Sequence, residues 1–184
     1  ELIRMIKTSS LINDFPSAFR YPRGTDTLTG QFEELNEIDI GKGYFVQEGN
    51  EIAILNLGTR LEEVKDAAEI LDSMGLSCTV ADARFAKPLD TDLIFDLSKN
   101  HELMITIEEG SSGGFGSHVL MYLAEKGILD DGLKIRNLYL PDIFIQQGDV
   151  NEMYTQAGLN SENIVNTALK VFGINNNEFK VIQS

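Results

Sequence analysis

The sequence has a single cysteine, no tryptophan and two histidines among its 184 residues. One cysteine cannot form a disulfide within the chain, and Cys78 lies in the apolar run LSCTVADA, where a buried thiol is favoured over a reactive one. Neither His101 nor His118 has a Cys, Asp or Glu at the spacing of zinc ligands. These absences exclude a disulfide-framework protein and a zinc protein, and the lone thiol suits a reducing cytoplasm.

Basic residues are also scarce, since 15 Lys and Arg stand against 29 Asp and Glu, for a net charge of -14. Such a surface repels polyanions and excludes a non-specific nucleic-acid binder, although a local basic patch can still hold a small phosphate. No apolar run approaches the roughly 20 residues of a membrane-spanning helix. With 42% hydrophobic residues, we expect a soluble globular protein or part of one, without nucleic-acid or membrane partners.

Strand patterns and amphipathic helix patterns alternate over residues 40–173. This alternation predicts an α/β fold, namely a three-layer α/β/α domain whose mostly parallel sheet is connected by right-handed crossovers. The run Ile52 to Leu57 is nearly all apolar and predicts an inner strand. The β-rich run before it is joined to it at Glu48-Gly49-Asn50, which predicts a hairpin at the sheet edge. Further strands are expected over 77–83, 102–109 and 133–140, and helices over 59–74, 91–99, 114–127, 149–158 and 161–172.

The segments on either side of this domain differ from it in composition and hydrophobic pattern. Residues 1–24 begin within an amphipathic helical pattern, and we expect them to be the last helix and strand of an upstream α/β domain. Residues 25–39 are polar, acidic and glycine-containing, which predicts a surface linker. Residues 174–184 form a polar tail.

The stretch FRYPRG at residues 19–24 places two arginines around a Tyr-Pro pair in this acidic chain. Pro22 favours extended geometry in the residue before it, so the stretch is expected to be a strand. Alternation along a strand sends the arginines to opposite faces, leaving Arg20 as a structural partner and Arg23 at the carboxyl edge, where open α/β sheets bind ligands. A guanidinium matches a phosphate or carboxylate, but pairing of such an arginine with Asp26 or with a loop carbonyl is the commoner arrangement.

Three other patterns give no catalytic set. Glu108 and Glu109 are adjacent in a strand, so they face opposite sides and cannot form one acid–base pair, and a solvated or domain-bridging role is favoured. The glycines of EEGSSGGFGSH can cradle a phosphate, but their spacing fits no nucleotide fingerprint, and a tight turn or close backbone approach is the competing explanation. The GDV run at 148–150 lacks the second glycine of a magnesium-diphosphate motif, and a helix cap at Asp149 explains it.

Six stretches together carry a family resemblance: PSAFRYPRG, IGKGYFVQEG, LGTRLEEV, VADARFAKPLD, TIEEGSSGGFGSHVL and LPDIFIQQGDVNEMYTQAGL. In order and character they resemble the carboxyl-terminal part of the 1-deoxy-D-xylulose-5-phosphate synthase family. The resemblance covers residues 15–170, and DARFAKPLD and GGFGSHVL are its most specific stretches. It implies a transketolase C-terminal-like domain over residues 40–173 and the end of a pyrimidine-binding domain over residues 1–24.

The family's activity, as the resemblance implies it, is a transfer reaction dependent on thiamine diphosphate and Mg²⁺. Pyruvate loses carbon dioxide and its remaining two-carbon unit joins glyceraldehyde 3-phosphate, which is the first step of the non-mevalonate isoprenoid pathway and also serves thiamine synthesis. Arg23 matches the family's arginine that contacts the phosphate of the aldehyde substrate. The resemblance implies a cytoplasmic homodimer and leaves a plastid-type organelle open.

The family's cofactor-binding and catalytic residues would lie upstream of Glu1. We therefore expect no catalytic, cofactor-binding or metal-binding residue in these 184 residues, and no turnover by them alone. The alternative is a non-catalytic α/β interface domain of another transketolase-like or 2-oxo acid dehydrogenase assembly. The sequence leaves open whether Glu108, Glu109, Arg84 or His118 contact a neighbouring domain.

Overall fold

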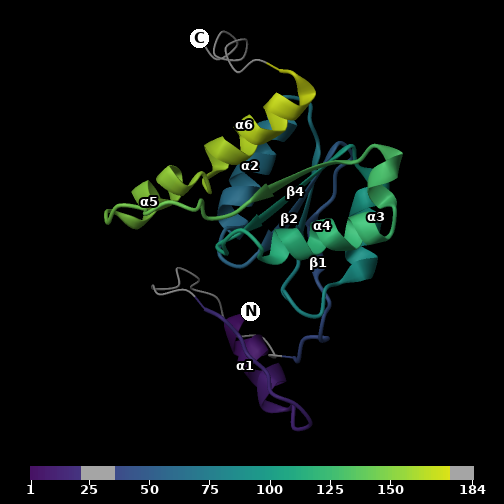
Figure 1. The fold of residues 1–184 in the computed structure, drawn as a ribbon, viewed down its shortest axis with the longest axis vertical. Helices are drawn as coiled ribbons and strands as arrows, with labels where there is room; N and C mark the ends of the chain where they lie inside the picture. Colours follow the sequence, from purple (N-terminus) through teal and green to yellow (C-terminus); the bar gives the residue numbers. More distant parts are fainter. Residues whose placement is uncertain (22–35, 175–184) are drawn as a thin grey trace.

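The computed structural model describes residues 1–21 and 36–174 (Figure 1). Helix α1 (Leu2–Ser10) lies apart from the elements that follow, near the amino-terminal end of the chain (Figure 1). The strands of the described residues are β1 (Tyr44–Gln47), β2 (Ile52–Leu57), β3 (Cys78–Asp82), β4 (Leu103–Glu108) and β5 (Lys134–Leu138). The other helices are α2 (Leu61–Ser73), α3 (Thr91–Asn100), α4 (Phe115–Glu125), α5 (Val150–Ala157) and α6 (Ser161–Phe172), with a 3-10 turn at Ile128–Asp131.

One sheet runs in the order β1-β3-β2-β4-β5, with β2 at its centre. Strand β2 pairs in parallel with both neighbours, so that Ile54 lies opposite Val80 on one side and Ile105 on the other. Strand β5 continues the parallel pairing next to β4, and β1 adds one antiparallel edge next to β3. The predicted α/β fold with a mostly parallel sheet is confirmed, as is the inner position of Ile52–Leu57.

The predicted hairpin is wrong, because β1 pairs with β3 and not with β2. The turn after β1 passes over the start of β3, where the N–H of Gly49 donates to Thr79 Oγ1 at 2.9 Å and that hydroxyl lies 3.0 Å from the Gly49 carbonyl. A Cβ on Gly49 would come within 2.6 Å of the Cys78 backbone nitrogen. Turn residues in the sequence predict that the chain reverses direction, but the strand it then pairs with is decided by packing.

Helices cover both faces of the sheet, α2 and α6 on one side and α3 and α4 on the other (Figure 1). Each face therefore has its own apolar core, and the inner strands β2 and β4 contribute to both. The thiol of Cys78 belongs to the core under α2 and α6, and burial raises its pKa to about 12. The prediction of a buried, unreactive cysteine is confirmed, since the thiolate is the reactive form.

The helix predictions hold to within a few residues, and the caps show why. Helix α6 has the predicted bounds, because the Asn160 side chain accepts from the N–H of Asn163 at 3.0 Å and Gly173 ends the helix at φ 69°. Asp149 caps α5 as predicted, but its carboxylate accepts from the N–H of Asn151 at 2.9 Å, two residues on.

The chain before the sheet departs from the prediction in two ways. Residues 15–21 form no strand ladder within the described part of the chain, where they have no neighbouring strand to pair with. The described end of the predicted linker is tied to α1, because the N–H of Ile38 donates to Thr8 Oγ1 at 2.9 Å and Ile38 is buried. The Arg4 Nε likewise donates to the Asn36 carbonyl at 3.0 Å.

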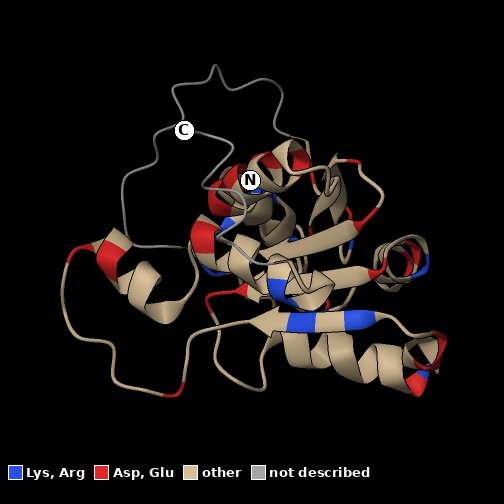
Figure 2. Ribbon diagram, turned by 90° about the horizontal axis from the view of Figure 1, so that it is seen from above, with Lys and Arg blue, Asp and Glu red and all other residues tan. Residues whose placement is uncertain are grey.

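The surface reflects the acidic composition, since Asp and Glu positions occur on most sides of the domain (Figure 2). Among the residues that the structure describes, no helix has both the length and the apolar character needed to cross a membrane.

Replacing Gly49 with alanine should destabilise the domain by about 1 to 3 kcal/mol, the usual range for an overpacked site. The added Cβ has no room beside the Cys78 backbone. Chemical denaturation measures the free energy of unfolding, with Gly148→Ala as the matched control, because a Cβ there would meet only the end of the Glu152 side chain at 3.3 Å. Equal unfolding free energies for the two variants would contradict this explanation.

Candidate functional site

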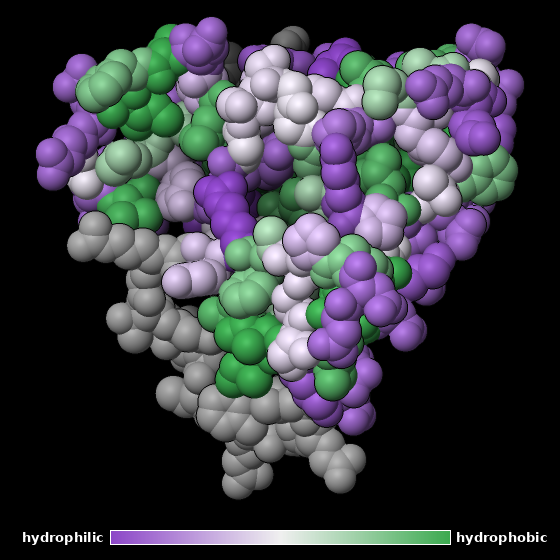
Figure 3. Space-filling model, turned by 60° about the horizontal axis from the view of Figure 1, so that its bottom comes forward, coloured by the Kyte–Doolittle hydropathy of each residue, from purple (hydrophilic) through white to green (hydrophobic). Residues whose placement is uncertain are grey.

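A cavity of 560 Å³ lies at the carboxyl ends of β2 and β4. After these neighbouring strands the chain leaves toward opposite faces of the sheet, to α2 and to α4. Open α/β sheets bind their ligands at such a topological switch point. Seen from the side of α1, the surface is hollowed there, with apolar groups inside and hydrophilic ones beside them (Figure 3). The wall is formed by Met5, residues 18–21, 57–59, 84–87 and 108–110, and Gly114, Phe115 and His118.

Glu108 ends β4 with its side chain buried against the start of α4. Its Oε1 accepts a hydrogen bond from the N–H of Gly116 at 2.9 Å. A Cβ on Gly114, the N-cap residue of α4, would lie 2.5 Å from the Glu108 Oε2. The glycine-rich turn therefore wraps a carboxylate of its own chain, which confirms the close backbone approach. Because that carboxylate occupies the amino-terminal end of α4, the nucleotide hypothesis loses its phosphate site.

Glu109 points to the other side of β4, as predicted, and its side chain is only 11% exposed. Its Oε1 accepts from the hydroxyl groups of Thr59 and Tyr154 and lies 3.3 Å from Arg60 Nε. The Arg60 guanidinium also stacks on the Tyr154 ring, at 3.5 Å from its centroid. Burial, and then the bond to Glu109, raises the pKa of Tyr154, so the phenol stays protonated and donates.

Arg20 brings the amino-terminal segment to the same carboxylate. Its Nη2 lies 3.6 Å from the Glu109 Oε2, and its Nη1 donates to the Glu109 backbone carbonyl at 3.4 Å. Glu109 therefore joins the segment around residue 20 to β4, the start of α2 and α5. This agrees with the predicted structural role of Arg20. Of the pair for which a solvated or domain-bridging role is favoured, Glu109 fits the bridging role, whereas Glu108 is buried against the start of α4 and fits neither.

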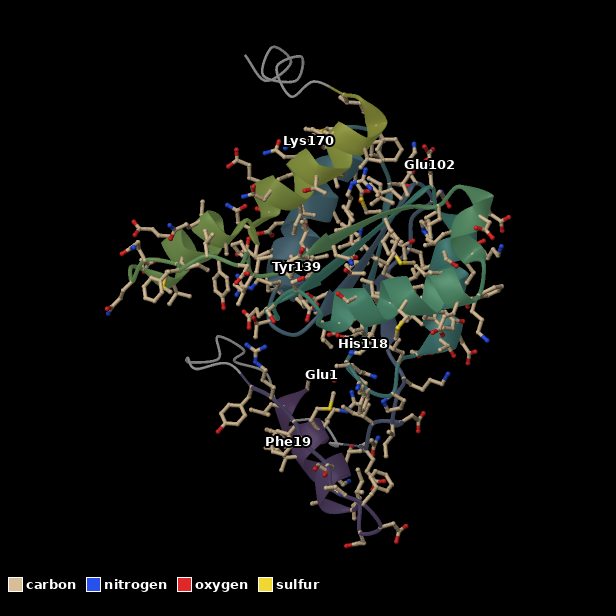
Figure 4. All side chains as sticks on the ribbon, viewed as in Figure 1. Glu1, Phe19, Glu102, His118, Tyr139 and Lys170 are labelled. Carbon is tan, nitrogen blue, oxygen red and sulfur yellow. The ribbon has the colours of Figure 1, made fainter. Side chains whose placement is uncertain are left out.

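The stretch DARFAKPLD forms a second part of the wall, next to β1 and α1. Arg84 has a left-handed backbone at φ 56°, which its N–H supports by donating to Asp82 Oδ1 at 2.9 Å. Burial raises the pKa of the Asp82 carboxyl, and the bond from Arg84 opposes that shift. The Arg84 guanidinium covers the Tyr44 ring at 4.0 Å and lies 3.0 Å from the Glu1 carboxylate. Glu1 and His118 face the space between α1 and α4 (Figure 4).

Arg23, the predicted phosphate-binding residue, lies outside the described residues. The segment that leads to it reaches the cavity wall at Tyr21. Over residues 1–21 and 36–174, no group of three or more His, Cys, Asp and Glu could hold a metal ion. Glu108 and Glu109 are already bonded to other groups of their own chain.

Sequence reasoning missed Thr59, Arg60 and Tyr154 as partners of Glu109. The signal available was indirect, because a carboxylate at the end of an inner strand must find donors when it is buried. The LGTR run directly after β2 offers such donors at the neighbouring strand end. Tyr154 lies in α5, 45 residues from Glu109, and no local pattern connects the two.

The strand order and the switch-point cavity define a doubly wound α/β domain, and comparison with known proteins identifies its family. Residues 41–164 match the transketolase C-terminal domain model, so the chain belongs to this family.

Solved structures of transketolases are similar to the chain, including the following two. One, a split gene transketolase described as an inactive beta4 tetramer, is 26% identical at a TM-score of 0.66, covering 76% of this chain and 45% of its own. The other, a transketolase from Campylobacter jejuni subsp. jejuni NCTC 11168, is 14% identical at a TM-score of 0.52, covering 71% and 18%. The second likeness shows the fold alone. The chain thus spans less than half of the length of these relatives.

Replacing Glu108 with alanine should lower the free energy of unfolding by about 1 to 3 kcal/mol, because the buried N–H of Gly116 loses its acceptor. The matched control is Glu102→Ala at the opposite end of the same strand, where the side chain is 56% exposed and pairs with Lys134. That change should have little effect on the free energy of unfolding. Chemical denaturation measures the free energy of unfolding of both variants. A similar decrease in both would contradict the role of Glu108 as the cap of α4.

Proposed function

We propose that these residues are the carboxyl-terminal part of a 1-deoxy-D-xylulose-5-phosphate synthase. The reaction is the condensation of pyruvate with glyceraldehyde 3-phosphate, with release of carbon dioxide. The observation that supports it most is the contact of Arg20 with Glu109, because it ties the segment leading to Arg23 to the carboxyl edge of the sheet. The specific stretches DARFAKPLD and GGFGSHVL both contribute to the wall of the same cavity.

In this proposal Arg23 binds the phosphate of glyceraldehyde 3-phosphate with its planar, permanently charged guanidinium. The domain from β1 to α6 holds the preceding segment in place through Glu109. Thiamine diphosphate, with Mg²⁺, supplies the two-carbon chemistry when it is bound. In this proposal the residues that bind thiamine diphosphate and Mg²⁺ belong to the upstream domains of the whole enzyme. We propose a homodimer in the cytoplasm, with a plastid-type organelle left open.

A second candidate function is that of a non-catalytic interface domain. The description of the similar split gene transketolase as an inactive tetramer favours this alternative. Two measurements distinguish the two functions. Light scattering gives the oligomeric state of the purified chain, and the gene gives the length of the encoded polypeptide. A tetramer of a polypeptide that lacks an upstream Gly-Asp-Gly motif would support the interface domain, whereas an upstream motif would support the synthase.

Changing Arg23 to alanine in the whole enzyme should raise KM for glyceraldehyde 3-phosphate and leave KM for pyruvate nearly unchanged. A charged hydrogen bond of this kind contributes about 1.5 to 3 kcal/mol, roughly ten- to a hundredfold in affinity. Steady-state kinetics with both substrates measure the effect. Arg136→Ala, an exposed arginine on β5 outside the cavity wall, is the control and should change neither KM. Equal loss for both substrates in the Arg23 variant would assign it a structural role.

The 184 residues alone should show no synthase activity, even with thiamine diphosphate and Mg²⁺ supplied, because in this proposal the residues that bind both groups lie in the upstream domains of the whole enzyme. Product formation from pyruvate and glyceraldehyde 3-phosphate can be followed by chromatography. The positive control is the same assay with a polypeptide that includes the upstream domains. Turnover by the 184 residues would show that the cofactor site had been assigned to the wrong part of the protein.

A further inference from the structure

Most of the charged groups that line the cavity are already paired within the chain. Glu108 and Glu109 accept hydrogen bonds from their own domain. Arg20 is paired with Glu109, and Arg84 is paired with the carboxylate of Glu1. The acids of the wall and two of its cations therefore have partners, so the remaining basic side chains decide what the cavity can bind.

Lys87 and His118 are those remaining basic side chains. Lys87 lies in the loop after β3 and His118 in the first turn of α4, so they reach the cavity from two different elements. Within the described part of the chain, neither side chain forms a hydrogen bond or an ion pair. An ammonium group has only donors, and a histidine ring carries at least one N–H. A group that satisfies both is an acceptor, and the ammonium favours one with negative charge.

Much of the remaining wall is apolar. Phe19, Phe85 and Phe115 line the cavity, together with Leu57 and Met5. Apolar groups lie inside the hollow and hydrophilic ones beside it (Figure 3). The volume of 560 Å³ suits a small organic molecule, since such ligands occupy pockets of about 300 to 1,000 Å³. A ligand that fills the cavity therefore combines an apolar body with its negatively charged acceptor group.

The charge of the chain limits the charge of the ligand. At a net charge of -14, the chain repels anions at long range, and this repulsion grows with the number of negative charges on the ligand. A phosphate also lacks the helix amino terminus that usually complements it, because the Glu108 carboxylate bonds to the start of α4. A carboxylate has one negative charge and two acceptor oxygens, so it suits both Lys87 and His118.

We propose that the cavity at the carboxyl ends of β2 and β4 is a binding site for a small monocarboxylate with an apolar body. Lys87 and His118 bind its carboxylate, and the phenylalanines of the wall cover its body. Burial of the body supplies most of the affinity, whereas the two donors make an acid preferred over a neutral molecule of the same shape. Such a site requires no synthase activity, because every residue that forms it belongs to the described part of this chain.

Naphthoate and its neutral amide, naphthamide, test this preference on the 184-residue chain. The two probes share the fused rings, but only naphthoate carries a carboxylate. The chain has no tryptophan, so the fluorescence anisotropy of the naphthalene rings reports binding without indole emission. Naphthoate should bind with the lower dissociation constant. Equal dissociation constants, or no rise in naphthoate anisotropy at millimolar protein, would overturn the proposal.

Two substitutions assign the carboxylate to its donors. Lys87→Gln removes the charge of an exposed side chain, and His118→Phe keeps a ring while removing its N–H groups. Each should reduce the preference for naphthoate over naphthamide by about two- to fivefold, the contribution of an exposed charged contact. Lys126→Gln, at the other end of α4 from His118, makes the same change of charge outside the cavity wall and should leave the preference unchanged.

A third substitution tests the apolar wall. Phe19→Ala should weaken both probes to a similar extent, because it removes apolar contact without changing charge. Its control is Phe144→Ala, which removes an exposed phenylalanine outside the cavity wall and should affect neither probe. The unfolding transition checks that each variant folds. If naphthoate binds and the Lys87, His118 and Phe19 variants all keep the parent affinity, the probe binds elsewhere and the proposed site is wrong.

Discussion

Two adjacent carboxylates at the end of the buried inner strand β4 are the constraint on which this edge of the molecule depends. A buried carboxylate is stable only when donors replace the water it has lost, so Glu108 and Glu109 each require a partner set. Because they face opposite sides of β4, the two sets come from different layers. Glu108 binds the start of α4 after the glycine turn. Glu109 contacts residues at the start of α2, in α5 and in the amino-terminal segment.

The glycine-rich stretch follows from the same requirement. In a nucleotide-binding protein such a turn leaves its N–H groups free to bind phosphate. Here the N–H of Gly116 already donates a hydrogen bond to the buried Glu108 carboxylate. A side chain on Gly114 would collide with the carboxylate, so the backbone can come close only as glycine. The glycine pattern that suggests a ligand site therefore serves the packing of the turn against Glu108. The cavity beside this turn lies between the strand ends and residues 18–21.

Much of the fold could be predicted from local sequence, and the errors share one cause. Helix bounds such as 161–172 depend on caps and periodicity within a few residues, so they were predicted well. The pairing of β1 with β3 and the lack of a ladder at residues 15–21 depend on which distant strand is available, which periodicity does not encode. At the site, the opposite orientation of Glu108 and Glu109 was predictable, but the contact with Tyr154 was not.

The sequence by itself determined the α/β class, the inner strands and the helix ends, because each follows from short-range periodicity or from the geometry of one residue. It also carried the resemblance on which the proposed reaction rests. Only the tertiary structure decided that Arg20 meets Glu109, 89 residues further along the chain, since hydrogen-bond partners of a buried charge are selected by the packing of several elements at once.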